Sequence, residues 1–142
     1  MQMTHRKSRS DAEALYLTVQ HLGRLLRDID VARGISNARF SVLVHLAFHG
    51  VDNVGELAAA ERVSRPAMTR LVQDMEKSGL VRRGADSRDG RGVLVELTKK
   101  GRVIMRHVRN EKITLVLRQL ESLEPDSKRH LGSALRRLLD KI

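Results

Sequence analysis

The chain has 142 residues, and its 27 Lys and Arg residues exceed its 17 Asp and Glu residues by enough to give a formal net charge of +10. A chain of this length has room for one hydrophobic core, so we expect one structural domain. The absence of cysteine excludes disulfides, thiolate metal ligands and thiol nucleophiles. Because only 2% of the residues are aromatic, aliphatic side chains must build the core, which favours helices over a β-sandwich.

The first ten residues and the overall charge indicate where the protein works and what it binds. Residues 1–10 contain Arg6, Lys7 and Arg9 but lack the apolar run of an export signal, so we expect a disordered basic tail. No stretch approaches the roughly 18–20 apolar residues of a membrane span, and the prediction is a cytoplasmic protein with no membrane partner. The excess of basic residues instead indicates a polyanionic partner, because Lys and Arg that neutralise phosphates release condensed counterions.

Helical spacing of apolar residues begins near the N-terminus. A helix is predicted over residues 11–33, with its apolar stripe formed by Ala12, Leu15, Val19, Leu22, Leu26 and Ile29. Gly34 is placed to end this helix. A second helix is predicted over residues 37–48, and Gly50 ends it.

Two short helices joined by a tight turn come next. Asn53 is placed to cap the first, over residues 54–60, and Glu56 is placed to reach back to the cap in a capping box. Ser64 is a strong N-cap for the second helix, which begins one residue later and has a proline in its first turn. Gly79 closes this helix, and four apolar residues put one of its faces into the core: Met68, Leu71, Val72 and Met75.

A glycine-rich hairpin follows these helices. Residues 80–83 and 93–97 are predicted strands, the second with alternating apolar residues. The connection, residues 84–92, contains three glycines and should project into solvent. A short helix, a tight turn, a second helix and a hairpin in this order indicate a mainly helical, winged helix-turn-helix fold.

The C-terminal part is predicted as two helices that serve dimerisation. Thr98 caps a long helix over residues 99–120, and Pro125 begins a last helix that runs to Ile142. The first and last helices have apolar stripes that one small domain cannot cover, so we predict that a twofold-related subunit covers them. The predicted dimerisation residues are Leu15, Val19, Leu22, Leu131, Leu135, Leu138 and Leu139. Within the one structural domain, the predicted segments are a tail (1–10), a dimerisation helix (11–35), a DNA-binding region (36–98) and the C-terminal dimerisation helices (99–142).

Two elements are predicted to contact DNA. The N-terminal end of a helix in the major groove can present side chains to base edges while its amides meet phosphates. The candidates on this helix are Ser64, Arg65, Pro66, Ala67, Thr69, Arg70 and Gln73. The minor groove attracts guanidinium groups through its negative potential, and for this contact we predict Arg88 and Arg91 of the hairpin. A run of basic residues on the next helix is either a further phosphate contact or a solvated face: Lys99, Lys100, Arg102, Arg106 and Arg109.

Five segments, in this order, carry a family resemblance: Val54–Ala58, Val63–Val72, Glu76–Val81, Asp86–Arg91 and Leu97–Gly101. With them the chain resembles the MarR family of bacterial transcription regulators over nearly its whole length. The resemblance implies a homodimer built from the first and the last two helices, a pseudo-palindromic operator, and commonly repression that small aromatic anions release. It also implies that Asp89 orients Arg91 at the tip of the hairpin.

Two other groups of residues are candidates for small ligands. His45 and His49 have the i, i+4 spacing of two zinc ligands, but no cysteine and no acid stands beside them at an obvious spacing. We interpret them as surface or interface histidines and predict no metal and no cofactor. The resemblance suggests an effector crevice between the dimerisation helices and the DNA-binding part, and His21 and Arg24 are the candidates to line it.

The sequence lacks the common catalytic motifs, so we predict that the protein is not an enzyme. Two functions stay open. The first is a sequence-specific DNA-binding repressor, and the second is a winged-helix protein-interaction module without specific DNA binding. The charge of +10 and the arginines on both groove-facing elements favour the first.

Overall fold

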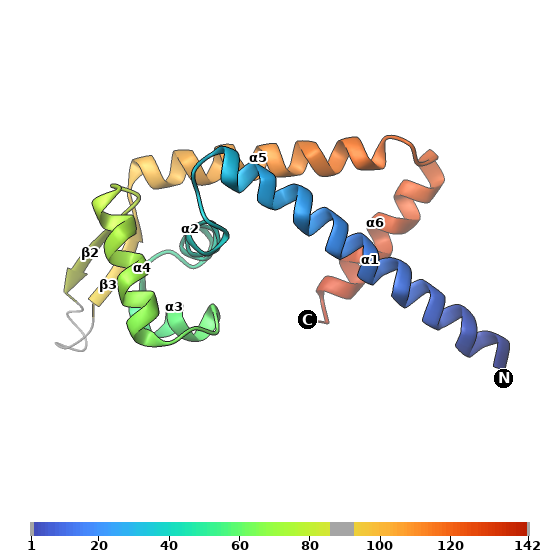
Figure 1. Ribbon diagram of the computed structural model, residues 1–142, viewed down its shortest axis with the longest axis horizontal. Helices are drawn as coiled ribbons and strands as arrows, with labels where there is room; N and C mark the ends of the chain where they lie inside the picture. Colours follow the sequence, from blue (N-terminus) through green and yellow to red (C-terminus); the bar gives the residue numbers. More distant parts are fainter. Residues whose placement is uncertain (1, 86–92, 142) are drawn as a thin grey trace.

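The computed structural model describes residues 2–85 and 93–141, and it is mainly helical (Figure 1). Over these residues the elements are α1 (Gln2–Ala32), α2 (Asn37–His49), β1 (Asp52–Asn53), α3 (Val54–Ala60), α4 (Arg65–Lys77), β2 (Val81–Ala85), β3 (Val93–Leu97), α5 (Lys99–Leu120) and α6 (Pro125–Leu139). The strands form one antiparallel sheet in the order β1-β3-β2. This arrangement confirms the predicted winged helix-turn-helix fold. In the described part of the chain, no helix is both long and apolar enough to span a membrane.

Side-chain caps define where four of the helices begin. The residues before α2, α3, α4 and α5 each accept a hydrogen bond from the backbone N–H three residues later: Ser36, Asn53, Ser64 and Thr98. At α3 only half of the predicted capping box forms. The Asn53 side chain accepts the Glu56 N–H at 2.9 Å, but the Asn53 N–H donates to Asp52 Oδ1 at 2.8 Å instead of to Glu56. The neighbouring carboxylate therefore takes the place of the predicted return bond.

The start of α1 differs from the prediction. A disordered tail was expected over residues 1–10 and a helix start at Asp11, whereas α1 begins at Gln2. No Gly or Pro interrupts the segment before Asp11, and extending an existing helix costs much less free energy than nucleating a new one. The basic composition of the segment therefore does not prevent helix formation.

Strand β1 is an element that the sequence did not predict. Its two residues, Asp52 and Asn53, pair with Val95 and Leu94 of β3. A two-residue strand is too short to show the alternation by which strands are recognised. Its pairing places the cap of α3 directly beside the sheet.

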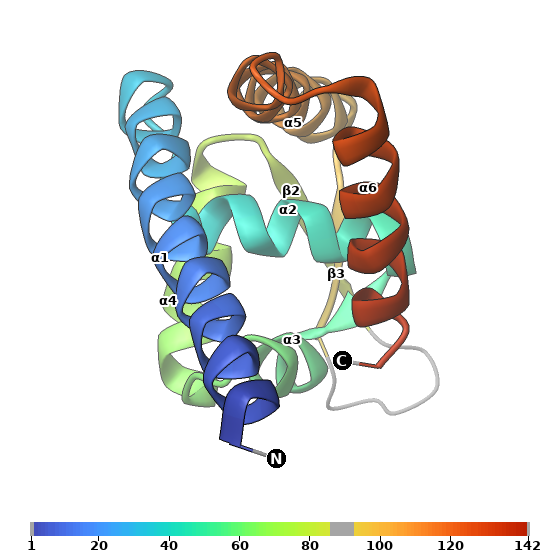
Figure 2. The same cartoon turned by 90° about the vertical axis from the view of Figure 1, so that its right-hand side faces the viewer.

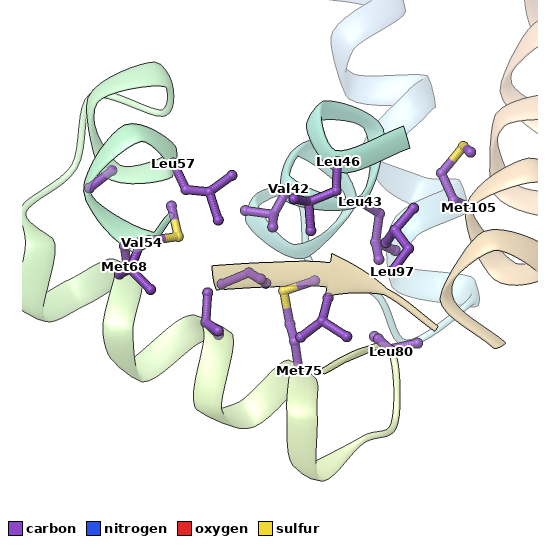
Figure 3. Close-up of a cluster of buried hydrophobic side chains, with 14 residues drawn as sticks. Val42, Leu43, Leu46, Val54, Leu57, Met68, Met75, Leu80, Leu97 and Met105 are labelled. Carbon is purple, nitrogen blue, oxygen red and sulfur yellow. The ribbon is translucent and has the colours of Figure 1, made fainter. Parts of the chain in front are cut away.

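The hydrophobic core lies between α2, α3, α4, the sheet and the start of α5 (Figure 3). Its largest fully buried side chains are Leu43, Leu46, Leu57, Met68 and Met75. Each such side chain contributes about 1.5–3 kcal/mol relative to an exposed one. Because Met68, Val72 and Met75 hold one face of α4 in this core, its opposite face is turned to solvent.

Helices α1, α5 and α6 extend away from this core (Figures 1 and 2). Helix α1 packs on α5 and α2 near its C-terminal end, whereas residues 8–21 are exposed. Helix α6, which the structure describes in full, buries none of its side chains. The predicted dimerisation residues are accordingly exposed, apart from the half-buried Leu22: Leu15, Val19, Leu131, Leu135, Leu138 and Leu139. The described part of the chain thus leaves these apolar faces uncovered.

Two ion pairs fasten the end of α1 to α5. Asp30, 3% exposed, has its Oδ1 at 2.7 Å from Nζ of Lys112, and this ammonium group lies 3.8 Å from the centre of the Phe40 ring. Arg33 donates through Nε to Glu111 Oε2 at 2.9 Å and through Nη2 to the other carboxylate oxygen. Removing one partner of the buried pair would leave an unpaired charge, which proteins tolerate poorly.

The Arg33–Glu111 pair makes stability depend on pH. The hydrogen bond from Arg33 holds the pKa of Glu111 below its ordinary value. A carboxyl group with a lowered folded-state pKa adds stability above its unfolded pKa of about 4.3 and loses it as the pH falls through the folded value. We expect Glu111→Gln to lower the melting temperature near pH 7, by less and less as the pH falls below about 4.

Thermal unfolding of both proteins between pH 7 and pH 3 measures this effect. Glu121→Gln is the control, because Glu121 is an exposed acid in none of the ion pairs among residues 2–85 and 93–141. If Glu111→Gln lowered the melting temperature by the same amount at pH 7 and at pH 3, the Arg33–Glu111 pair would not be the source of the pH dependence.

Candidate nucleic-acid interface

The exposed face of α4 begins with a well-defined N-terminal end. The Ser64 hydroxyl accepts the Ala67 N–H at 3.4 Å, and Pro66 has no N–H that would need a partner. Six of the predicted contact residues follow Ser64 on this helix: Arg65, Pro66, Ala67 and Arg70 are exposed, and Thr69 and Gln73 are half-buried. The structure therefore places the predicted set together at one accessible helix end.

The polar groups at this end are largely free to meet a ligand. Arg65 and Arg70 take part in none of the ion pairs formed within the described ranges, so no protein acid neutralises their charges there. Thr69 donates its hydroxyl hydrogen to the Arg65 carbonyl at 2.9 Å, which leaves its oxygen able to accept. Two guanidinium groups and the positive end of the helix dipole together attract anions.

The turn between α3 and α4 fixes the direction of this helix. Arg62 has a φ of +53°, in the left-handed region that favours glycine, and its N–H donates to the Ala59 carbonyl at 3.1 Å. The Ser41 hydroxyl of α2 donates to Glu61 Oε1 at 2.7 Å. Helices α2, α3 and α4 are thus held in one arrangement by hydrogen bonds as well as by the core.

Ion pairs join strand β2 to α4 and to its neighbouring strand β3. Arg83 of β2 donates through Nε to Glu76 Oε2 at 2.6 Å, and Arg82 Nε lies 2.5 Å from Glu96 Oε1 across the strand pair. Ala85 and Val93 form the last described pair of the hairpin. The predicted wing residues lie outside the described residues: Arg88, Asp89 and Arg91.

Helix α4 and the wing strands form one continuous surface. A hollow of about 80 Å³ lies where they meet, and it is lined in part by Arg65 and Thr69 from α4 and by Arg83 and Val93 from the strands. The two elements that were predicted to enter adjacent DNA grooves are therefore neighbours. Sequence reasoning missed Arg83, whose position in a strand gave no sign that it would lie beside α4.

The basic start of α5 does not belong to this surface. Lys100 Nζ donates to the Ser78 carbonyl at 2.8 Å, at the C-terminal end of α4. A helix of 13 residues is about 20 Å long, so Lys100 lies about a helix length from Ser64. Figure 1 shows α5 on the opposite side of the core from α3. This placement favours the solvated-face interpretation over phosphate contact from the same bound duplex.

The two histidines of α2 contact each other and an acid. The His45 and His49 ring centres are 4.5 Å apart, and His45 Nε2 lies 2.9 Å from Asp52 Oδ2. Asp52 follows the helix end, and only the β1–β3 pairing brings it beside His45, so the sequence spacing did not reveal it. Across the described segments, no group of three or more His, Cys, Asp or Glu residues is placed to hold a metal ion.

The candidates for the effector crevice stand apart from the interface. His21 and Arg24 are both exposed on α1. A groove of about 370 Å³ between α1, α2 and α5 includes Leu26, Phe40 and Val44, but neither of these two candidates lines it. The structure thus does not bring His21 and Arg24 into that groove.

An exposed, basic helix end beside a β-hairpin defines a DNA-binding protein of the winged helix-turn-helix class. Residues 33–92 match the model of the MarR family. An HTH-type transcriptional regulator of Mycobacterium leprae is 32% identical over 131 residues, which cover 92% of each chain. The chain belongs to the MarR family of transcription regulators, and it is a regulator that binds DNA and not an enzyme.

Two further proteins document the relationship. A MarR family protein from Bacillus stearothermophilus has a solved structure with a TM-score of 0.87 and 26% identity, covering 96% of each chain. The transcriptional repressor MprA of Escherichia coli K12 is 27% identical over 113 residues, which cover 78% of this chain and 64% of that protein. Similarity therefore extends over the helices outside the DNA-binding core as well as over the core.

Proposed function

We propose that the protein is a homodimeric, sequence-specific repressor that binds a pseudo-palindromic operator and leaves it when a small aromatic anion binds. The observation that carries the sequence-specific binding is the exposed N-terminal end of α4, where Arg65 and Arg70 form no ion pair with an acid of residues 2–85 or 93–141. In this proposal α4 enters the major groove with seven residues: Ser64, Arg65, Pro66, Ala67, Thr69, Arg70 and Gln73. The wing residues Arg88, Asp89 and Arg91 are assigned to the minor groove.

The uncovered apolar faces of α1 and α6 support the homodimer. Leu135 and Leu138 are each about two-fifths exposed, and no side chain of α6 is buried. A soluble monomer rarely leaves such a continuous apolar surface uncovered. A twofold partner would cover it and present two recognition helices about one DNA turn apart, roughly 34 Å.

Leu138→Glu should convert the dimer into a monomer. The twofold axis places the substitution in the interface twice, and each charge loses its water when the interface forms. Sedimentation of the purified protein at micromolar concentration measures the mass. Phe48→Glu is the matched control, because Phe48 is 73% exposed on α2, in the DNA-binding part, and its substitution should leave the dimer intact. A dimeric Leu138→Glu protein would contradict the assignment of α6.

Selection of bound duplexes from a random pool tests the DNA part of the proposal. We expect enrichment of inverted half-sites separated by about one helical turn. Uniform recovery of all sequences would instead support the alternative, a winged-helix module that binds another protein. A reporter placed behind the selected operator then shows the direction of regulation, since a repressor lowers its expression.

The repressor part of the proposal is supported by the transcriptional repressor MprA among the relatives. The effector part rests on the family relationship alone. A small aromatic anion would release the operator only if it binds the DNA-free shape more tightly than the DNA-bound shape. Repeating the selection with benzoate or a phenolic acid tests this directly. His21 and Arg24 are proposed to contact such an effector from α1.

A further inference from the structure

A carboxylate on α4 holds an arginine of the wing, the hairpin formed by β2 and β3. Strand β2 runs beside α4 (Figure 1). Arg83 of β2 donates through Nε to Glu76 Oε2 at 2.6 Å and through its backbone N–H to Glu76 Oε1 at 3.2 Å. One carboxylate thus fixes both the strand and the side chain of Arg83. About a third of each side chain is exposed, so the pair lies at the surface and not in the core.

Most of the donors of Arg83 are still available. A guanidinium group has five N–H donors, and the bond to Glu76 uses only the one on Nε. The two terminal NH₂ groups of Arg83 have no hydrogen-bond partner among residues 2–85 and 93–141. Because the guanidinium group is planar and rigid, a bond that fixes Nε also orients these groups. Arg83 is therefore an oriented cation with four free N–H donors within the described part of the chain.

The hollow between α4 and the wing is a place where an anionic group fits. Its lining residues in the described structure include two arginines and no acid: Val54, Arg65, Thr69, Val72, Arg83 and Val93. The two positive charges repel each other, and an anion placed beside both of them is attracted by both. The volume of about 80 Å³ is far below the roughly 300 Å³ at which small-molecule sites begin. The hollow therefore suits one anionic group and not a free organic ligand.

The proposed placement of α4 and the wing brings the DNA backbone to this hollow. The major and minor grooves of a duplex are neighbours, and a sugar-phosphate strand separates them. In the proposed function α4 enters the major groove and the wing enters the adjacent minor groove. The strand between the two grooves must then cross the junction of α4 and the wing, where the hollow lies. This step rests on the groove placement of the proposed function, but it does not require sequence specificity.

We propose that the hollow binds one phosphate group of the DNA backbone, that Arg83 donates to this phosphate, and that Glu76 is the positioning residue that orients Arg83. Two N–H groups of a guanidinium can donate in parallel to two phosphate oxygens. Such a contact carries no information about the bases, but it fixes the register of the protein on the duplex. Arg83 thus adds affinity for every DNA sequence, whereas the exposed face of α4 supplies the specificity.

The role of Glu76 reverses the usual effect of removing an acid. Loss of an acid near a polyanion normally strengthens binding, because a repulsion disappears. Glu76→Gln should instead weaken DNA binding by about threefold, the effect of one partly exposed ion pair. Gln keeps the shape of Glu, but only one of its two terminal atoms accepts hydrogen bonds, so Arg83 is no longer held in one orientation.

Asp74→Asn is the matched control for Glu76→Gln. Asp74 is exposed on the same helix, and in the described structure its carboxylate is paired only with Lys77, at 3.7 Å. The substitution removes the same charge from α4 without touching the wing. We therefore expect Asp74→Asn to leave DNA binding unchanged or slightly stronger, opposite in direction to Glu76→Gln.

Arg83→Gln tests the phosphate contact itself. Fluorescence anisotropy with a labelled operator and a labelled random duplex, between about 50 and about 200 mM salt, measures affinity and its salt dependence. We expect both duplexes to bind about tenfold more weakly, and the slope of log affinity against log salt to flatten by about 0.9 for each bound subunit. Arg82→Gln is the control, because Arg82 is paired with Glu96 and does not line the hollow. It should keep the wild-type slope.

A double substitution separates positioning from a merely structural role. In an Arg83→Gln background, Glu76→Gln should no longer weaken DNA binding, because the residue that it orients is absent. Equal weakening by Glu76→Gln with and without Arg83 would overturn the positioning role. Thermal unfolding at one protein concentration shows whether each variant is folded. If Arg83→Gln is unfolded, Arg83→Lys replaces it, and its weaker binding at an unchanged salt slope is expected, since Lys keeps the charge but loses the parallel donors.

An unchanged salt slope in Arg83→Gln, or wild-type affinity in Arg83→Lys, would overturn the phosphate contact. The random duplex keeps this test independent of the proposed repressor function, because a phosphate contact forms on any sequence. A wild-type protein that binds operator and random duplex equally would refute sequence-specific regulation. The effect of Arg83→Gln on the random duplex would still decide the phosphate contact, so the two failures are distinguishable.

Discussion

Gly101→Ala should unfold at a much lower temperature than the wild type. A Cβ atom added at Gly101 would lie 2.0 Å from the Leu80 carbonyl oxygen and 3.0 Å from its carbon. These are backbone atoms, so no side-chain rotation relieves the contact. The Leu80 carbonyl is also held in place, since it accepts the Thr98 N–H at 3.1 Å.

Relief of this clash requires α5 to move away from the end of α4. Thr98 caps α5 by accepting the Gly101 N–H at 3.0 Å and donates its hydroxyl to the Gly79 carbonyl at 2.7 Å. A shift of α5 therefore strains the helix cap and the glycine turn together. We expect a loss of about 3 kcal/mol, which corresponds to a melting temperature lower by roughly 10 °C.

Thermal and urea unfolding at one fixed protein concentration measure this loss, because the stability of a dimer depends on concentration. Gly132→Ala is the matched control. The nearest atoms to its added Cβ belong to the flexible Arg136 side chain at 3.6 Å, so the substitution should stabilise α6 by about 0.5–1 kcal/mol. Equal stability of Gly101→Ala and the wild type would contradict the close packing of the Leu80 carbonyl against Gly101 of α5.

The sequence predicted well those elements whose ends are set by local chemistry. The bounds of α3 and α5 and the start of α4 agree with the structure, because Asn53, Thr98 and Ser64 act on backbone groups within three residues. The exposed face of α4 was also predictable, since helical periodicity determines which side chains the core can take. The predicted DNA-contacting set of α4 therefore assembles without any long-range information.

The features that the sequence did not predict depend on contacts between distant segments. Strand β1 exists because Asp52 meets Val95, and the same pairing brings the Asp52 carboxylate to His45. The groove lined by Gly34, Ser78 and Lys100 joins residues from three segments of the chain. The restriction at Gly101 comes from the carbonyl of Leu80, which lies 21 positions earlier in the sequence. Periodicity and capping report on neighbours within one or two turns, so neither has access to these approaches.

Arg70→Ala should weaken binding to the selected operator by about 1–3 kcal/mol per half-site and relax the preference at one base-pair position. Arg70 is exposed on the second turn of α4, on the same row as Pro66, and forms no ion pair within the described part of the chain. A guanidinium group there can donate two parallel hydrogen bonds to one guanine. Competition binding with operators that differ at single positions measures both effects.

A change in charge alone would also weaken DNA binding, and Arg106→Ala separates the two causes. It removes the same charge from α5, whose first turn contacts the end of α4 opposite Ser64, and screening over about 8–10 Å reduces its effect on a duplex bound at Ser64. We expect Arg106→Ala to keep the operator preference of the wild type with little change in affinity.

The ratio of operator to random-duplex affinity decides whether Arg70 reads a base. A base contact lowers this ratio, because only the operator affinity contains the lost bidentate bond. A phosphate contact lowers both affinities together and leaves the ratio unchanged, with a flatter dependence on salt. An unchanged ratio in Arg70→Ala would therefore move Arg70 from base reading to backbone binding, and the specificity of α4 would then have to come from Arg65, Thr69 and Gln73.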